Sequence, residues 1–128
     1  MRKLVPFVSM LLAFAFLLSA CGTASGPVRA VEDYLGALVS KDINRLVVLS
    51  CADWAQSAAD EMNSFQAVTI RLEGLSCAEA GTDGAYTLVD CQGNIVVSYD
   101  GEDQAIDLSL RTYQVVEQGG EYLVCGYR

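Results

Sequence analysis

The sequence predicts an α+β domain in which N-terminal helices pack on a four-stranded antiparallel sheet. Between residues 27 and 63, apolar residues recur every three or four positions, which is the period of an amphipathic helix. From residue 68 onward, apolar and polar residues alternate, and short polar or glycine-rich turns separate the alternating segments. Helices followed by strands with short connections are typical of α+β folds with an antiparallel sheet.

The first twenty residues have the composition of an export signal. Arg2 and Lys3 make the start positive, and residues 4–18 are apolar but shorter than the ~20 residues that a membrane-spanning helix needs. The tetrapeptide Leu18-Ser19-Ala20-Cys21 follows, and it resembles the lipobox of bacterial lipoproteins. The resemblance implies that a signal peptidase removes residues 1–20 and that the Cys21 thiol carries a diacylglyceryl group. An uncleaved helical anchor with an incidental cysteine is the alternative.

Residues 21–26 form the expected lipidated tether, because the residues after the cysteine are small and flexible. The folded domain is then expected over residues 27–128. Pro27 suits the first turn of a helix, where its missing N–H is not needed, and apolar residues follow at helical spacing to Val39.

Two shorter helices are expected next. Asp42 is the predicted N-cap of a helix that ends at Leu49, with Leu46 and Val47 directed inward. A third helix ends near Asn63. Its predicted N-cap is Ser50 or Asp53, and its predicted inner face carries Trp54, Ala58 and Met62.

Four strands are expected after the helices. The first contains Val68, Ile70 and Leu72, and turns are expected at residues 81–84, 100–103 and 119–120. The second strand is expected over residues 85–99, with Gly93 at a bulge or bend. In the third strand, which begins near Ile106, the apolar residues change from even to odd positions at Arg111–Thr112, and this change predicts a bulge there. The fourth strand covers residues 121–127.

The four cysteines of the domain predict two disulfide bonds, because their number is even and the chain carries an export signal. A zinc site is the alternative, but the sequence has no CxxC pair and no histidine. Cys77 and Cys91 flank one turn and are expected to pair, which leaves Cys51 to pair with Cys125. Cys77 is out of phase with the first strand, so this pairing requires a bulge near Gly74.

Two parts of the chain resemble NTF2-like, or cystatin-like, α+β domains. They are the helix Val28-Arg29-Ala30-Val31-Glu32-Asp33-Tyr34-Leu35 with its continuation into Lys41-Asp42, and the closing stretches 111–117 and 121–125. The resemblance covers about residues 27–127 and is strongest to small NTF2-like lipoproteins of unassigned function. It implies a sheet that curves around the helices as a cone. The fold by itself implies no reaction.

The expected mature chain is strongly acidic. Without Arg2 and Lys3 it has 6 basic and 16 acidic residues, a net charge of −10. Such a surface repels nucleic acid and anionic headgroups. It is explained either by solubility or by a docking face for a basic partner.

Few catalytic arrangements are compatible with this sequence. The absence of histidine excludes Ser-His and Cys-His nucleophile systems, no GxxxxGK phosphate loop occurs, and residues 100–103 lack the ligand pattern of an EF-hand. We therefore expect no catalytic residue, no metal site and no cofactor. Trp54 is expected to lie in the core beside a disulfide, or else in the wall of a ligand pocket.

The NTF2-like resemblance offers one enzymatic alternative. Ketosteroid isomerase and polyketide cyclases of this fold place an acidic base and a Tyr or Asp donor inside the cone. The spacing of the corresponding residues here matches neither enzyme; Tyr34 is expected in the core with its hydroxyl at the rim, and Asp107 in solvent. The candidates on these elements are Tyr34, Tyr86, Tyr99, Tyr113, Asp33, Asp90 and Asp107.

The sequence thus predicts a non-enzymatic binding or interaction module of the cell envelope, lipid-anchored on the extracytoplasmic side of a bacterial membrane. Its expected partners are the membrane, through the lipid on Cys21, and an envelope protein, but not nucleic acid. An isomerase or cyclase, or an accessory subunit that docks through its acidic face, are the alternatives. An open cone with an inward carboxylate would favour an enzyme, and a filled or shallow cone would favour interaction.

Overall fold

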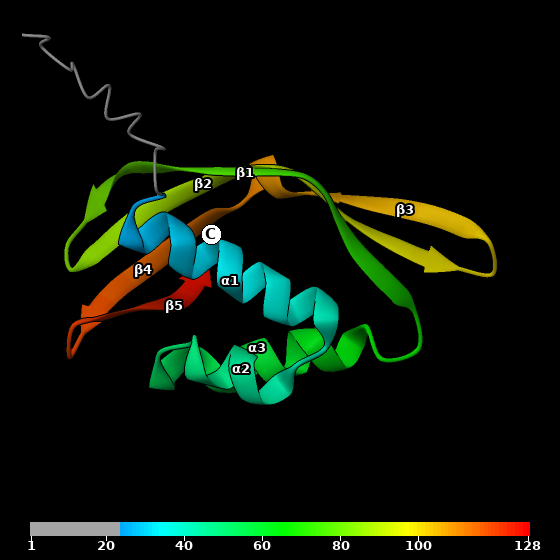
Figure 1. Ribbon diagram of the computed structural model, residues 1–128, viewed down its shortest axis with the longest axis horizontal. Helices are drawn as coiled ribbons and strands as arrows, with labels where there is room; N and C mark the ends of the chain where they lie inside the picture. The colour runs from blue at the N-terminus through cyan, green and yellow to red at the C-terminus, as the bar shows by residue number, and fades with distance from the viewer. Residues whose placement is uncertain (1–23) are drawn as a thin grey trace, which may run out of the picture.

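The computed structural model describes residues 24–128, so the expected signal peptide and the lipidation site Cys21 lie outside the described residues. Helices cover one face of an open antiparallel sheet (Figure 1). Among residues 24–128, no helix is both long enough and apolar enough to cross a membrane. The elements are α1 (Gly26–Ser40), α2 (Ile43–Val48), α3 (Ala52–Ser64), β1 (Thr69–Asp83), β2 (Tyr86–Tyr99), β3 (Glu102–Asp107), the 3-10 turn η1 (Leu108–Leu110), β4 (Thr112–Gln118) and β5 (Glu121–Tyr127).

The first helix, α1, lies along the concave side of the sheet and contacts β1, β2, β4 and β5 (Figure 1). The Ser25 hydroxyl accepts a hydrogen bond from the Val28 N–H at 3.4 Å and so caps the helix, which begins at Gly26 rather than at Pro27. The helix buries one stripe of side chains completely. That stripe contains Val31, Tyr34, Leu35 and Leu38.

The second helix, α2, is capped as predicted, because the Asp42 carboxylate accepts the Arg45 N–H at 3.1 Å. Leu46 is buried as predicted, but the prediction that Val47 points inward is wrong, since 41 % of its surface is exposed. A helix of six residues presents little more than one residue to the layer beneath it.

The third helix, α3, begins differently from the prediction. Its N-cap is Cys51, without a capping side chain, and neither Ser50 nor Asp53 caps it. The Ser50 hydroxyl instead donates to the Leu46 carbonyl at 2.7 Å, and the Cys51 N–H donates to the Val124 carbonyl of β5 at 2.9 Å. The backbone at the start of α3 is therefore held by the sheet. Only Ala58 and Met62 of its 13 residues are buried.

The sheet has five strands instead of the four predicted, in the order β1-β2-β4-β5, with β3 also paired to β2. The predicted third strand is divided into β3 and β4 by η1. The Asp107 carboxylate closes this turn, because it accepts from the Ser109 N–H at 2.9 Å and from the Ser109 hydroxyl at 2.7 Å. The change in the alternation of apolar residues near Arg111 therefore comes from a turn, and the predicted bulge at Arg111–Thr112 is wrong. The first hairpin turn is also tighter than predicted, since β1 continues to Asp83.

The predicted bulge in β1 is present at Gly74. Pairing with β2 shifts register between Glu73 and Ser76, with Gly74 at φ 64° and Gly93 opposite at φ 105°. A Cβ atom on Gly93 would lie 2.5 Å from the Glu73 carbonyl oxygen, so the close approach of the strands requires glycine. The extra residue brings Cys77 directly opposite Cys91.

Two disulfide bonds follow from this arrangement, as the sequence predicts. Cys77 is bonded to Cys91 across the β1–β2 pair, with a Cα–Cα distance of 4.0 Å. Cys51 is bonded to Cys125 at a Cα–Cα distance of 5.2 Å, and this bond joins residues 74 positions apart. The second bond attaches the start of α3 to β5.

We expect removal of either disulfide to destabilise the domain, and removal of Cys51–Cys125 to cost more. Chain entropy gives about 4 kcal/mol for the double Cys→Ser variant at Cys51 and Cys125, and about 3 kcal/mol for the variant at Cys77 and Cys91. Urea unfolding of the two variants beside the native chain measures the difference. A Cys51–Cys77 or Cys51–Cys91 peptide recovered without reduction would contradict this connectivity.

Candidate functional site

The interior between the helices and the concave face of the sheet contains a group of aromatic rings around one ion pair. We call this group the aromatic cluster. It brings together side chains from α1, α3, β4, β5 and the residue that precedes β4. Its members are Tyr34, Trp54, Glu61, Arg111, Tyr113 and Tyr127.

An ion pair between Glu61 and Arg111 joins α3 to the sheet. The Arg111 Nη1 atom donates to Glu61 Oε1 at 2.9 Å, and the two side chains are only 16 % and 13 % exposed, respectively. The same Nη1 lies 3.4 Å from the Tyr113 hydroxyl oxygen, and the guanidinium carbon lies 4.1 Å from the centre of the Tyr127 ring. The Tyr127 hydroxyl donates to Glu61 Oε1 at 3.5 Å. Glu61 Oε2 is buried and has no hydrogen-bond partner among the described residues.

The rings of the aromatic cluster pack edge to face. Ring centres lie 6.3 Å apart for Tyr34–Tyr113, 5.5 Å for Tyr113–Tyr127 and 5.6 Å for Trp54–Tyr127. The Trp54 Nε1–H donates to the Tyr34 hydroxyl oxygen at 3.0 Å. Trp54 therefore packs in the interior and connects α3 to α1.

Burial raises the pKa of two tyrosine hydroxyls in the aromatic cluster. Desolvation raises the pKa of Tyr113 to about 12, against the opposing effect of Arg111, and it also raises the pKa of Tyr34 well above the usual range. Both groups are protonated at neutral pH and so are not bases; the Tyr34 hydroxyl accepts from Trp54 and the Tyr113 hydroxyl accepts from Arg111. Among the described residues, no three Cys, Asp or Glu side chains are grouped closely enough to hold a metal ion.

The structure brings together only two of the residues considered as catalytic candidates, Tyr34 and Tyr113. Tyr34 is in the core as predicted, but its hydroxyl is not at the rim, because the whole side chain is buried. The three aspartates lie outside the aromatic cluster. Asp33 pairs with Arg45 at 3.5 Å, Asp90 accepts from the Thr112 hydroxyl at 2.7 Å, and Asp107 is exposed as predicted.

Glu61, Arg111 and Tyr127 are the members of the aromatic cluster that sequence reasoning missed. A signal for Glu61 was present: it follows Ala58 by three positions and Trp54 by seven, and so lies on the buried face of α3. The sequence gives no such signal for Arg111, because the direction of its side chain depends on the turn η1 that precedes it.

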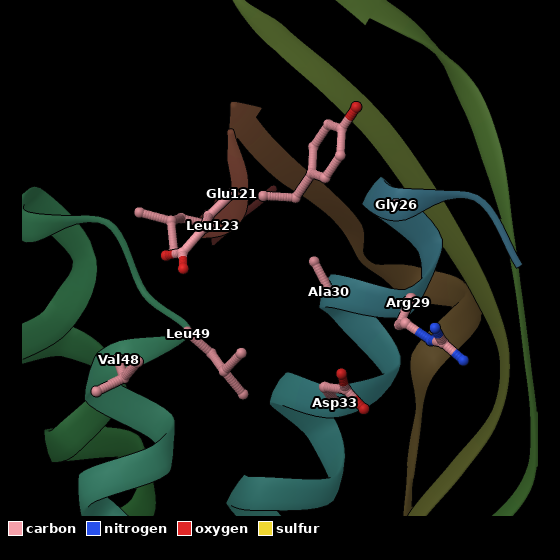
Figure 2. Close-up of a pocket in the computed structure, with 9 residues that line it drawn as sticks. Gly26, Arg29, Ala30, Asp33, Val48, Leu49, Glu121 and Leu123 are labelled. Atoms are coloured by element: carbon pink, nitrogen blue, oxygen red, sulfur yellow. The ribbon is translucent and has the colours of Figure 1, made fainter. Parts of the chain in front are cut away.

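Three hollows of the described surface lie outside the aromatic cluster. One of about 170 Å³ adjoins Cys51 and Tyr86, and one of about 220 Å³ lies beneath the β2–β3 hairpin beside Tyr99. The largest of the three, about 320 Å³, opens between the start of α1, the end of α2 and β5 (Figure 2). We call it the tether groove. Its lining consists of Gly26, Arg29, Ala30, Asp33, Val48, Leu49, Glu121, Tyr122 and Leu123.

Comparisons with known proteins show a shared fold and no family. No family model and no curated protein matches the sequence. RPA3114, a SEC-C motif containing protein from Rhodopseudomonas palustris, is similar in structure with a TM-score of 0.54 and 13 % identity, over 80 % of this chain and 77 % of that one. Pgp2, a helical cell shape determining protein from Campylobacter jejuni, has a TM-score of 0.51 and 8 % identity, over 77 % of this chain and 38 % of its own.

We expect the domain to lose stability at alkaline pH because of Tyr113. A pKa that rises from 10.0 to about 12 on folding contributes stability that is full below about pH 10 and is lost as the pH rises to about 12. The loss attributable to Tyr113 is about 2–3 kcal/mol. Urea unfolding at about pH 9 and about pH 11.5 measures it.

Tyr113→Phe should reduce this pH dependence because it keeps the ring and removes the ionisable group. Tyr99→Phe is the control, since Tyr99 is 63 % exposed, and it should behave as the native chain does. An unchanged pH dependence in Tyr113→Phe would contradict the interpretation.

Proposed function

We propose that this chain is an extracytoplasmic lipoprotein, held on a membrane through lipid on Cys21, and that its NTF2-like domain is a non-enzymatic binding or interaction module. The observation that carries the proposal is the filled interior. The concave side of the sheet holds completely buried side chains, among them Tyr34, Leu35, Ile95 and Tyr113. A domain packed in this way acts through its surface.

The state of Glu61 also supports interaction over catalysis. It is the carboxylate of the aromatic cluster, and its Oε1 already accepts from Arg111 and Tyr127. An isomerase or cyclase needs a carboxylate base that faces its substrate. The three hollows described above do not reach Glu61.

Two further features support the NTF2-like and extracytoplasmic parts of the proposal. The order of the elements, with a long first helix beneath a curved antiparallel sheet, agrees with what the sequence resemblance to NTF2-like domains implies (Figure 1). Disulfide bonds persist in oxidising compartments, so the pairs Cys51–Cys125 and Cys77–Cys91 favour export. The expected partner is an envelope protein, and nucleic acid is disfavoured by the acidic surface.

Intact mass of the chain produced in a bacterial host tests the anchor. The native chain should lose residues 1–20, carry acyl mass on Cys21 and sediment with membranes, while Cys21→Ala should accumulate uncleaved. Ser19→Ala keeps a small residue before the cleavage site and should be processed normally. A mature protein that begins elsewhere and lacks acyl mass would refute lipidation.

Affinity capture of the lipidated protein from solubilised membranes tests the module, with quantitative mass spectrometry and Cys21→Ala as the comparison. The proposal predicts a discrete partner that co-purifies with the lipidated form alone. Turnover of a small molecule by the pure protein, abolished in a folded Glu61→Gln variant, would instead establish the enzymatic alternative.

A further inference from the structure

Exposed apolar side chains gather on the short helix α2. Ile43, Val47 and Val48 expose 40 %, 41 % and 69 % of their surface, and we call these three residues the α2 face. The other large apolar residues exposed in the described part of the chain, Tyr99 and Leu110, are at single positions elsewhere. A group of exposed apolar residues is typical of a contact surface, while isolated ones are ordinary.

The α2 face is continuous with the tether groove. Val48 belongs to both, and Leu49 continues the apolar lining toward Ala30 on α1 and Leu123 on β5 (Figure 2). Gly26, the first residue of α1, lines the same groove. The apolar surface therefore adjoins the point at which the chain enters the domain.

The short tether fixes this surface near the bilayer. Gly26 comes five positions after Cys21, and an extended chain of five Cα–Cα steps reaches at most about 17 Å. A lipid on Cys21 thus holds the start of α1 close to the headgroups. The tip of the β2–β3 hairpin lies at the other end of the long axis of the molecule (Figure 1).

The charge distribution matches this orientation. Residues 24–49 contain three basic and three acidic side chains, whereas residues 50–128 contain three basic and 13 acidic ones, so the net charge of −10 belongs entirely to the second segment. Of those 13, only Glu121 lines the tether groove. The segment that forms α1 and α2 is therefore neutral, and it meets less repulsion from an anionic membrane than residues 50–128 would.

Size argues against the acyl chains of Cys21 as occupants of the tether groove. The groove has a volume of about 320 Å³ and is open to solvent. A chain that left the bilayer for it would lose about 0.8 kcal/mol for every methylene left in water. The bilayer remains the better environment for the lipid.

We propose that the α2 face and the tether groove rest on the lipid bilayer, so that the domain is oriented on the membrane with its β2–β3 hairpin pointing away. The inference rests on the proposed lipid at Cys21. The anchor supplies the attachment, and the α2 face selects one orientation out of those that a flexible tether allows.

Tryptophan fluorescence on vesicles tests the orientation. The lipidated chain with Val48→Trp, or with Tyr99→Trp as the control at a similarly exposed site, is placed in phosphatidylcholine vesicles whose acyl chains carry bromine. The native protein provides the signal of Trp54 for subtraction. Both sites are exposed, so both variants are expected to fold. Residue 48 should lose most of its emission and residue 99 should lose almost none.

Vesicle flotation, measured on the same samples, separates the two proposals. A protein that floats but shows equal quenching at both sites, or none at residue 48, overturns the orientation and leaves the anchor standing. Absence of quenching at residue 48 together with cross-links from it to a protein in native membranes assigns the α2 face to a protein partner instead. A protein that does not float overturns both proposals.

Discussion

The attachment of α3 to the sheet and to α1 is the constraint on which the rest of the structure depends. This helix buries only Ala58 and Met62, so apolar burial alone holds it weakly. Three specific links compensate: the Cys51–Cys125 bond at its start, the Trp54 hydrogen bond to Tyr34, and the Glu61–Arg111 ion pair near its end. Together they close the helical layer over the concave face and fill the space beneath it.

The same links also determine which parts of the domain are accessible to a partner. Because the aromatic cluster occupies the interior and its charges neutralise each other, the features available to a partner are on the outside. These are the α2 face with the tether groove, and the acidic surface that residues 50–128 provide. With the proposed lipid on Cys21, a domain with two such surfaces could rest on a membrane and present the acidic one to a partner.

Much of the fold was predictable because local signals agreed with it. Helical and strand periods located the layers, and the phase of Cys77 indicated the bulge at Gly74 that the structure contains. The fifth strand was missed because η1 depends on the Asp107–Ser109 hydrogen bonds, which alternation does not report. The interior was only half predictable. The periodicity of the sequence indicates Tyr34 and Tyr113 as interior residues. Glu61 and Arg111, however, are 50 positions apart, and no local pattern indicates that they form an ion pair.

A double-mutant cycle at Glu61 and Arg111 tests most directly whether the aromatic cluster holds the two layers together. Glu61→Gln and Arg111→Met should each cost about 3 kcal/mol, because each leaves a largely buried charge without its partner. The double variant should cost at least about 2 kcal/mol less than the two single changes together. Strictly additive losses, with no coupling between the two positions, would contradict the account.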